Sequence, residues 1–207
     1  MKIAVIGATR GIGLELVKIA LAEGHEVTIL ARDPDRMPIA DNHLRIIQGN
    51  ALDWKAVFKV VEGQDVVCSC LGTTDVMKKI TMFSRCAENL SRTLKAEQLL
   101  IAVTGLGAGD SKGHCGILYD RFFLPVVLKR IYADKDIEES IIQNQLNRWI
   151  IVRPGFLNNG PRTGCYRALI DLNGIHGGRI SRSDVADFIL NQAKSPQFIG
   201  QTPMLIY

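Results

Sequence analysis

The chain of 207 residues lacks any run of eighteen apolar residues, and its N-terminus lacks the pattern of a secretory signal peptide. We therefore expect a cytoplasmic protein with no membrane partner. The five cysteines form an odd set without a C-x-x-C pair, and only Cys68 and Cys70 lie close together, on one face of an expected strand. Nothing near them completes a metal site, so we expect buried, reduced thiols and no bound metal.

Strong charge and repetitive sequence are missing as well. The net charge is only +4, and the basic residues are spread along the chain without interleaved aromatic residues, which predicts no nucleic-acid partner. The chain shows no internal repeat and no linker. With 47% hydrophobic and 22% charged residues it is long enough to bury a proper core, and we expect one domain over residues 1–207.

What is present begins at the N-terminus. Residues 2–6 read as a short apolar strand, residues 7–13 (GATRGIG) as a glycine-rich turn, and residues 14–22 have helical spacing. Such a unit gathers backbone N–H groups and the positive end of a helix at one point, which suits a pyrophosphate. The first glycine allows the tight turn, Gly11 lets the phosphates approach, and the last glycine lets the helix pack. The spacing is G-x-x-x-G-x-G rather than G-x-G-x-x-G, and we predict dinucleotide binding.

The end of the second strand addresses the type of dinucleotide. A carboxylate about 20 residues after the glycines binds the ribose hydroxyls of NAD, whereas an arginine accommodates the 2′-phosphate of NADP. Here Arg32 is the first charged residue after the strand, Arg36 follows one turn later, and Arg10 lies in the glycine turn. This pattern favours NADPH. Two alternatives remain: the arginines are solvated loop charges, or an inward-facing Asp33 selects NAD.

The rest of the chain alternates strands and helices. We expect strands at residues 25–30, 44–47, 65–70, 99–103, 149–152 and 204–206, and an extra strand within 165–172. We expect helices at residues 53–61, 78–97, 117–145 (interrupted by Pro125) and 182–194. Continuous apolar strands with helices between them predict an α/β fold, a single-domain Rossmann fold with a doubly wound parallel sheet and helices on both faces.

Ligands of such sheets bind beyond the carboxyl ends of the strands, where the winding reverses. The candidate cofactor-binding residues therefore lie just after each strand. They are Gly7, Thr9, Arg10, Gly11, Ile12, Arg32, Arg36, Asn50, Ala51, Leu71, Gly72, Thr73, Thr104, Gly105, Pro154, Gly155, Phe156 and Leu157. Each taken singly has an alternative interpretation as turn chemistry.

The strings GATRGIG, LARDPDRMP, GNALD, CLGT, IIVRPGFL and ISRSDVADFIL resemble the atypical short-chain dehydrogenase/reductase group over essentially the whole chain. Within that group the chain is most similar to the NADPH-dependent flavin reductases, also called biliverdin-IXβ reductases. The resemblance implies NADPH bound along the strand ends and hydride transfer to a flavin or an open tetrapyrrole. VRPG and GATxxxG also occur in sugar epimerases and regulatory cofactor sensors.

The chain departs from that family at several positions. Asn50 stands where relatives have an aspartate against the adenine, Thr104-Gly105 where most keep a serine, and Phe156 where flavin reductases have a histidine. The Tyr-x-x-x-Lys pair of ordinary short-chain dehydrogenases is absent, because Tyr119, Tyr132 and Tyr166 have no lysine four residues later. Carbonyl reduction through a tyrosine is therefore not expected, whereas a flavin can take its proton from solvent.

Two residues are weak catalytic candidates. Lys135 could hydrogen-bond the nicotinamide ribose, or it is a solvated helix lysine paired with a carboxylate. His114 could donate a proton, or it is a solvated loop histidine. His114 belongs to the glycine-rich segment 105–116, which we interpret either as a loose lid over the substrate or as a flexible surface loop.

Two function classes follow. The first is an NADPH-dependent reductase that transfers hydride to a flavin (FMN, riboflavin) or a biliverdin-like tetrapyrrole. The second is a non-catalytic protein that senses NADP(H) or supports the assembly of another complex. The missing tyrosine–lysine pair fits both, and it argues against sugar epimerisation.

Overall fold

The computed structural model describes residues 1–73, 75, 79–116, 121–122 and 128–207. Its strands are β1 (Lys2–Ile6), β2 (Glu26–Ala31), β3 (Leu44–Gln48), β4 (Val66–Ser69), β5 (Leu99–Val103), β6 (Trp149–Pro154), β7 (Phe156–Asn158), β8 (Arg167–Leu169), β9 (Arg179–Ser181) and β10 (Met204–Ile206). Its α-helices are α1 (Gly11–Ala22), α2 (Trp54–Val61), α3 (Met82–Thr93), α4 (Lys129–Gln145) and α5 (Arg182–Lys194).

The main sheet has the strand order β3-β2-β1-β4-β5-β6-β10-β8, and β7 pairs with β9 in a separate two-stranded sheet. Strands β1 to β6 are parallel to their neighbours, so their carboxyl ends share one edge. The winding reverses between β1 and β4. This arrangement confirms the predicted doubly wound α/β fold and places the switch point at the glycine turn.

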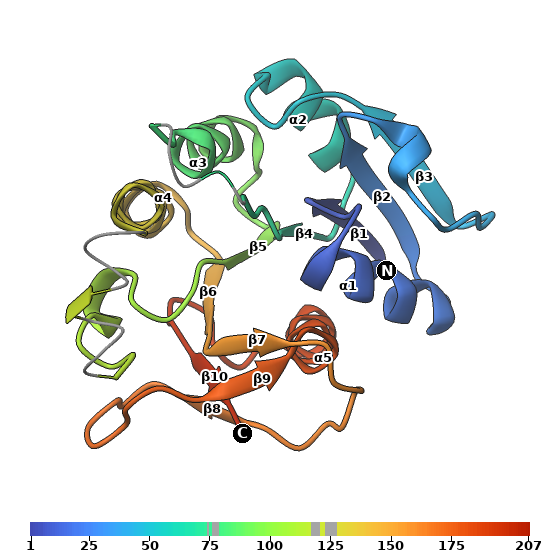
Figure 1. Ribbon diagram of the computed structural model, residues 1–207. Coiled ribbons are helices and arrows are strands. Elements are labelled where there is room, and N and C mark those ends of the chain that lie inside the picture. Colours follow the sequence, from blue (N-terminus) through green and yellow to red (C-terminus); the bar gives the residue numbers. More distant parts are fainter. Residues whose placement is uncertain (74, 76–78, 117–120, 123–127) are drawn as a thin grey trace.

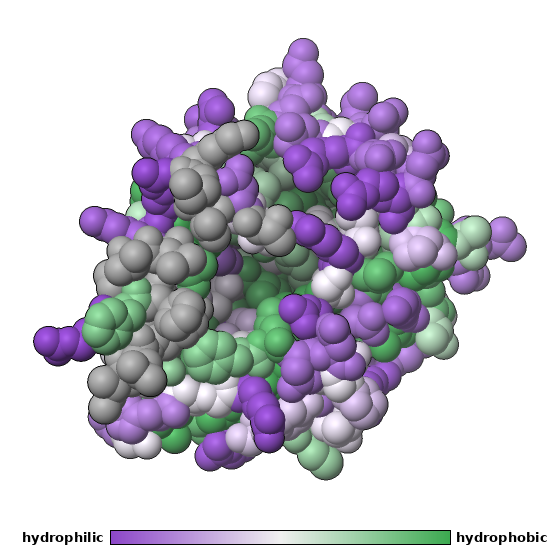
Figure 2. All heavy atoms as spheres, in the orientation of Figure 1, coloured by the Kyte–Doolittle hydropathy of each residue, from purple (hydrophilic) through white to green (hydrophobic). Residues whose placement is uncertain are grey.

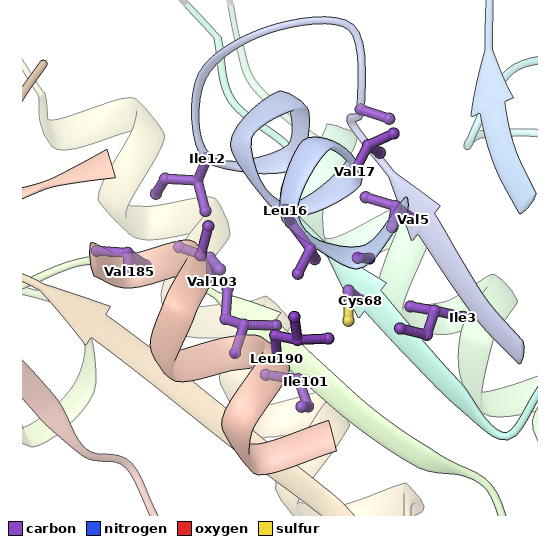
Figure 3. Close-up of a cluster of buried hydrophobic side chains, with 14 of the residues drawn as sticks. Ile3, Val5, Ile12, Leu16, Val17, Cys68, Ile101, Val103, Val185 and Leu190 are labelled. Atoms are coloured by element: carbon purple, nitrogen blue, oxygen red, sulfur yellow. The ribbon is translucent and has the colours of Figure 1, made fainter. Parts of the chain in front are cut away.

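Helices cover both faces of the sheet (Figure 1). Helices α1 and α5 lie on one face, and α2, α3 and α4 lie on the other. Figure 3 shows how α1 and α5 meet over the strands: Ile12 and Leu16 of α1 point toward Val185 and Leu190 of α5, above Val103 of β5. Strands β1, β2, β4, β5 and β6 are buried from both sides, which explains their largely apolar sequences, whereas the edge strand β3 is mostly exposed.

The structure corrects several predicted elements. The sheet is not parallel throughout, because β8, the short strand within residues 165–172, runs antiparallel to β10. Helix α3 ends at Thr93 rather than Glu97, because Leu94 is extended and the Lys95 N–H bonds to Gln98 Oε1. Of the helix predicted over 117–145, only the α4 part is confirmed, and residues 117–120 and 123–127 lie outside the described residues.

The cysteines are mostly, but not all, buried. Cys68, Cys86 and Cys115 are buried and Cys70 is half-buried, whereas Cys165 is exposed, so the expectation of buried thiols is wrong at that position. Burial raises the pKa of the Cys70 thiol to about 12, which keeps it protonated and unreactive. In the described part of the chain no group of three or more His, Cys, Asp or Glu is placed to hold a metal. None of the helices described there is long and apolar enough to cross a bilayer.

Candidate functional site

The glycine turn after β1 is shaped by the protein's own backbone at two positions. Gly7 has φ +88°, and a Cβ there would lie 2.5 Å from the Cys70 carbonyl oxygen. A Cβ at Gly13 would lie 2.2 Å from the Gly7 carbonyl oxygen. Any side chain at either position would collide with main chain, so these glycines let the turn close against β4 and let α1 begin directly above β1.

Gly11 has a different environment. It opens α1 with φ +62°, and among the described residues the only atom within 4 Å of a Cβ built there is the Arg182 Nε, at 4.0 Å. Gly72, in the loop after β4, likewise faces open space. Room for a ligand therefore lies between the loops that follow β1 and β4, on the two sides of the switch point. Figure 2 shows this face of the molecule hollowed near its centre, with apolar and weakly polar residues in the hollow and hydrophilic residues above it and to its right.

The N-terminus of α1 is electrostatically suited to an anion. The helix has no side-chain cap at Arg10 and no acidic residue in its first turn. Its first N–H groups and its positive dipole end are thus not neutralised by a carboxylate. The Arg10 guanidinium donates a long hydrogen bond, 3.4 Å, to the Gly72 carbonyl oxygen and so bridges the two loops.

At the end of β2, Arg32 and Arg36 are both exposed, and so are Asp33 and Asp35. Residues 34–36 form a short 3-10 turn that carries Arg36 one turn beyond Arg32. The parallel pairing of β2 with β1 puts this turn beside the glycine turn at the same edge of the sheet. Arg10 bonds to the loop after β4, on the side of β1 away from β2.

The other candidate residues also follow strands at this edge, but several point into the protein. Ile12, Ala51, Thr104, Gly105, Pro154 and Gly155 are buried, whereas Thr9, Leu71 and Thr73 are half-buried and Asn50, Gly72, Phe156 and Leu157 are exposed. The Asn50 side chain accepts from the Leu52 N–H and Thr73 Oγ1 accepts from the Asp75 N–H, so both shape their own turns. A Cβ at Gly155 would meet the Gly178 carbonyl oxygen at 2.5 Å, which makes this glycine a packing requirement.

Lys135 is buried, so its interpretation as a solvated lysine is wrong. Its ammonium donates to the Thr104 carbonyl oxygen at 2.7 Å and lies 4.4 Å from the centre of the Phe83 ring. Burial lowers the pKa of Lys135, and the nearby carboxylates of Glu138 and Glu139 oppose that change. Tyr132, three residues earlier in α4, donates its hydroxyl to the Leu106 carbonyl oxygen at 2.8 Å. Both polar groups therefore hold the main chain that follows β5.

A buried charged network lies behind them. Arg153 of β6 forms a two-pronged pair with Glu139, at 3.1 Å and 2.6 Å, and its remaining arm contacts Asp110. The Thr104 hydroxyl donates to Glu139 at 2.6 Å, so it is directed away from the open edge. Glu138 is buried beside this group, and its Oε2 has no hydrogen-bond partner among the described residues. Burial raises the pKa of Glu138 to about 7.

The glycine-rich segment 105–116 is anchored rather than loose. The Gly109 N–H donates to Asp136, Ser111 bonds to the main chain at Gly107 and Ala108, and Leu106 packs in a small apolar cluster with Met204 and Ile206. Residues 105–108 are buried, so the interpretation as a surface loop is wrong for this part, whereas the lid over the substrate stays a hypothesis. The carbonyl groups of segment 105–116 bond mostly within the segment, from the Ala108 N–H to Gly105 and from the Ser111 N–H to Ala108, and the Leu106 carbonyl oxygen accepts from Tyr132 of α4.

His114 is held at the end of this segment. Its Nδ1 lies 3.0 Å from the Ile175 carbonyl oxygen, and its ring stacks on that of His176 at a centroid distance of 6.3 Å. The loop that carries His176 also approaches Phe156: a Cβ at Gly177 would lie 3.9 Å from the Phe156 ring. His114 is therefore a bonded, half-buried histidine, not a solvated one, on the side of the site formed by β6 and β7.

Comparison of the sequence with protein-family models identifies the family of this chain. The model of the NAD(P)H-binding family matches residues 7–196, which is nearly the whole chain. The chain belongs to this family. The predicted nicotinamide dinucleotide cofactor is thereby confirmed as NAD(P)H, and the preference for NADPH stays a prediction. The strand ends described above are the edge at which a Rossmann sheet binds a dinucleotide.

Three known proteins with similar sequence or structure are reductases by name. A 3-diazoavenalumate denitrifying reductase from Streptomyces is 44% identical over 61 residues, a match that covers 30% of this chain and 19% of that enzyme. An anaerobillin reductase from Escherichia coli O157:H7 has a TM-score of 0.80 at 23% identity, covering 100% of this chain and 97% of the other. A Streptococcus pneumoniae TIGR4 protein named as a candidate NADH-flavin reductase has a TM-score of 0.78 at 23% identity, covering 100% and 99%.

The residues present fit the cofactor. The open space at Gly11, the unneutralised start of α1 and the absence of a Cβ at Gly72 form a cradle that a side chain would fill.

Sequence reasoning did not find Arg182 beside this cradle or the buried pair of Arg153 with Glu139. An arginine inside an apolar strand, followed by a search for a carboxylate on a neighbouring helix, is the signal that would have revealed the pair.

Proposed function

We propose that this protein is an NADPH-dependent reductase of a planar acceptor, a flavin or a biliverdin-like tetrapyrrole. The observation that carries the proposal is that two polar side chains of α4 close to the end of β5 already donate hydrogen bonds within the protein. The Tyr132 hydroxyl and the Lys135 ammonium donate to carbonyl oxygens of the protein at 2.8 Å and 2.7 Å. Neither is arranged to donate a proton to a substrate. An acceptor that can take its proton from solvent fits such a site.

In this proposal the glycine turn and the start of α1 bind the cofactor's pyrophosphate, and Arg32 and Arg36 bind the 2′-phosphate. When bound, the nicotinamide supplies the hydride. The chain's own contribution is orientation: the network of Lys135, Glu139 and Arg153 fixes the main chain after β5 and β6, where the nicotinamide and the acceptor must meet.

The acceptor side is provided by Phe156. Its side chain is 44% exposed at the start of β7, beside the turn that carries Gly177. An exposed aromatic ring next to the nicotinamide position can stack on an isoalloxazine or a pyrrole ring. The names of two structurally similar proteins, an anaerobillin reductase and a candidate NADH-flavin reductase, support this class of acceptor.

The direct test is to mix purified protein with NADPH and, separately, FMN, riboflavin and biliverdin, and to follow absorbance at the nicotinamide band. We expect cofactor-dependent oxidation with at least one acceptor. The Phe156→Ala variant should raise the apparent KM for that acceptor, with the NADPH Kd unchanged. No oxidation of NADPH by any of the three acceptors, with the cofactor bound, would reject the proposal.

A second candidate is an NADP(H) sensor or assembly protein without turnover. It is favoured by the loss of polar groups on the nicotinamide side, since the Thr104 hydroxyl is taken by Glu139 and residue 105 is a glycine. Tight NADPH binding without oxidation in the same experiment would support this candidate over the reductase.

A further inference from the structure

A second cation lies at the glycine turn, and it comes from the other end of the chain. Arg182 is the first residue of α5, and its Nε lies 4.0 Å from the position of a Cβ on Gly11. Its neighbour Ser181 caps α5 by accepting the Asp184 N–H at 2.9 Å, so the backbone that carries Arg182 is fixed.

The packing of α1 against α5 explains why Arg182 reaches this point. Ile12 and Val185, near the starts of the two helices, belong to one buried cluster (Figure 3). At the far ends, Lys194 of α5 pairs with Glu23, just after α1, at 2.8 Å. The two helices therefore run parallel, and both begin at the carboxyl edge of the sheet. Two positive helix ends and Arg182 converge beside Gly11.

The Arg182 charge has no carboxylate partner. Its guanidinium donates a 2.7 Å hydrogen bond from Nη1 to the neutral side chain of Asn159. Among the described residues no carboxylate lies within ion-pair distance of this half-buried guanidinium. The nearest acid in sequence, Asp184, is fully buried and accepts from Thr163, Gly164 and Tyr207. A half-buried cation beside two helix starts is favourable when an anion occupies the space.

We propose that Arg182 binds the pyrophosphate of NAD(P)H, together with the N–H groups at the start of α1. The inference rests on the proposed placement of the cofactor and adds a binding residue to it. Arg182 lies at the glycine turn, whereas Arg32 follows β2. The two arginines should therefore serve different phosphates, with Arg182 acting on the part that NADPH and NADH share.

The test compares Arg182→Gln with Arg32→Ala, and measures the Kd of NADPH and of NADH by calorimetric titration of each protein. We expect Arg182→Gln to weaken both cofactors by the same factor, about tenfold to a hundredfold, as the loss of a charge-assisted hydrogen bond predicts. Arg182→Lys should lose less, because it retains the charge but not the planar fork. Arg92→Gln is the matched control, since Arg92 is an exposed arginine in the last turn of α3, toward the opposite edge of the sheet.

Kd values for Arg182→Gln within twofold of the unmodified protein would overturn the inference, and so would a loss confined to NADPH. The melting temperature of each apo variant shows that it is folded, and if Arg182→Gln does not fold, the two Kd values of Arg182→Lys decide by the same criterion. The placement itself is tested apart from Arg182: retained binding by a folded Gly11→Val protein would show that the cofactor lies elsewhere.

Discussion

Arg32 and Arg36 are exposed at the end of β2, and the fold of the surrounding backbone does not require an arginine at either position. Any favourable free energy from these two side chains must therefore come from binding a ligand or from solvation. We expect Arg32→Ala to weaken NADPH binding about tenfold or more and to leave NADH binding unchanged, because only NADPH carries the 2′-phosphate. The Kd of both cofactors gives the answer, with Arg92→Ala as the control. Equal affinities for both cofactors in the unmodified protein would overturn the assignment of the 2′-phosphate to Arg32, and tighter binding of NADH would indicate that Asp33 selects the cofactor.

Gly11 allows a controlled test of the pyrophosphate site, because the chain contains a second glycine, Gly24, with a similar backbone conformation. Gly11 and Gly24 have positive φ angles of +62° and +77°, and a Cβ at Gly24 would meet nothing within 4 Å among the described residues. Gly11→Val and Gly24→Val should therefore carry a similar backbone strain, about 1–2 kcal/mol. Only Gly11→Val should abolish NADPH binding, because only that side chain fills the pyrophosphate space. Loss of binding by Gly24→Val as well would attribute the effect to strain.

Tyr132 and His114 carry groups that could donate a proton, and this role can be tested directly. Tyr132→Phe and His114→Ala should each keep the turnover rate within about tenfold, since a true general acid contributes ~10²–10⁴. Both residues already bond to carbonyl oxygens of the protein, Leu106 and Ile175 respectively. Steady-state rates with NADPH and the active acceptor measure the effect. A thousandfold loss in either variant, with the NADPH Kd intact, would show that the protein supplies the proton.

At the scale of elements, most strands that position the site could be predicted because β1, β2, β4, β5 and β6 are largely apolar and buried from both sides. Strands β7 and β9 could not, because each has only three residues and their pairing joins segments that are far apart in the sequence, from Phe156 with Arg179 to Asn158 with Ser181. The glycine turn was also predictable, since its chemistry is local. Arg182 was not, because its place depends on how α5 packs against α1.

Helix α4 carries a titratable group that should make stability depend on pH. Glu138 faces Lys135, Glu139 and Asp134, and burial raises its pKa from 4.5 to about 7. Below pH 4.5 the carboxyl is protonated in both the folded and the unfolded chain. Between these values only the unfolded chain loses the proton, so the free energy of unfolding falls as pH rises toward 7 and stays lowered above it.

Glu138→Gln should remove this decrease in the free energy of unfolding with rising pH. Because Oε2 has no hydrogen-bond partner among the described residues, the neutral amide costs less to bury than a carboxylate. Relative to the unmodified protein, the variant should gain about 2 kcal/mol in free energy of unfolding between pH 5 and pH 8. Urea unfolding at the two pH values measures the gain, and Glu88→Gln, an exposed change in α3, is the control. An equal effect at both pH values would mean that Glu138 is ionised throughout.

At the scale of the whole molecule, the cofactor edge is assembled from both ends of the chain. Glu23, after α1, pairs with Lys194 of α5 and with Arg162, and Arg162 also pairs with Asp187 of α5. These ion pairs and the apolar contact between α1 and α5 fix the position of the glycine turn relative to the start of α5. A ligand bound between them should stabilise the entire fold rather than one loop.

The expected size of that stabilisation follows from mass action. NADPH at a hundred times its Kd should add about 2.7 kcal/mol to the free energy of unfolding. For a domain of this size that corresponds to a rise in melting temperature of about 5–10 °C. NADH at the same concentration should give a smaller rise, because it lacks the phosphate that Arg32 and Arg36 bind. Thermal unfolding monitored by circular dichroism at several cofactor concentrations separates the two. A melting temperature that does not change with NADPH would contradict binding to the folded chain at this edge, whatever the activity measured with flavins.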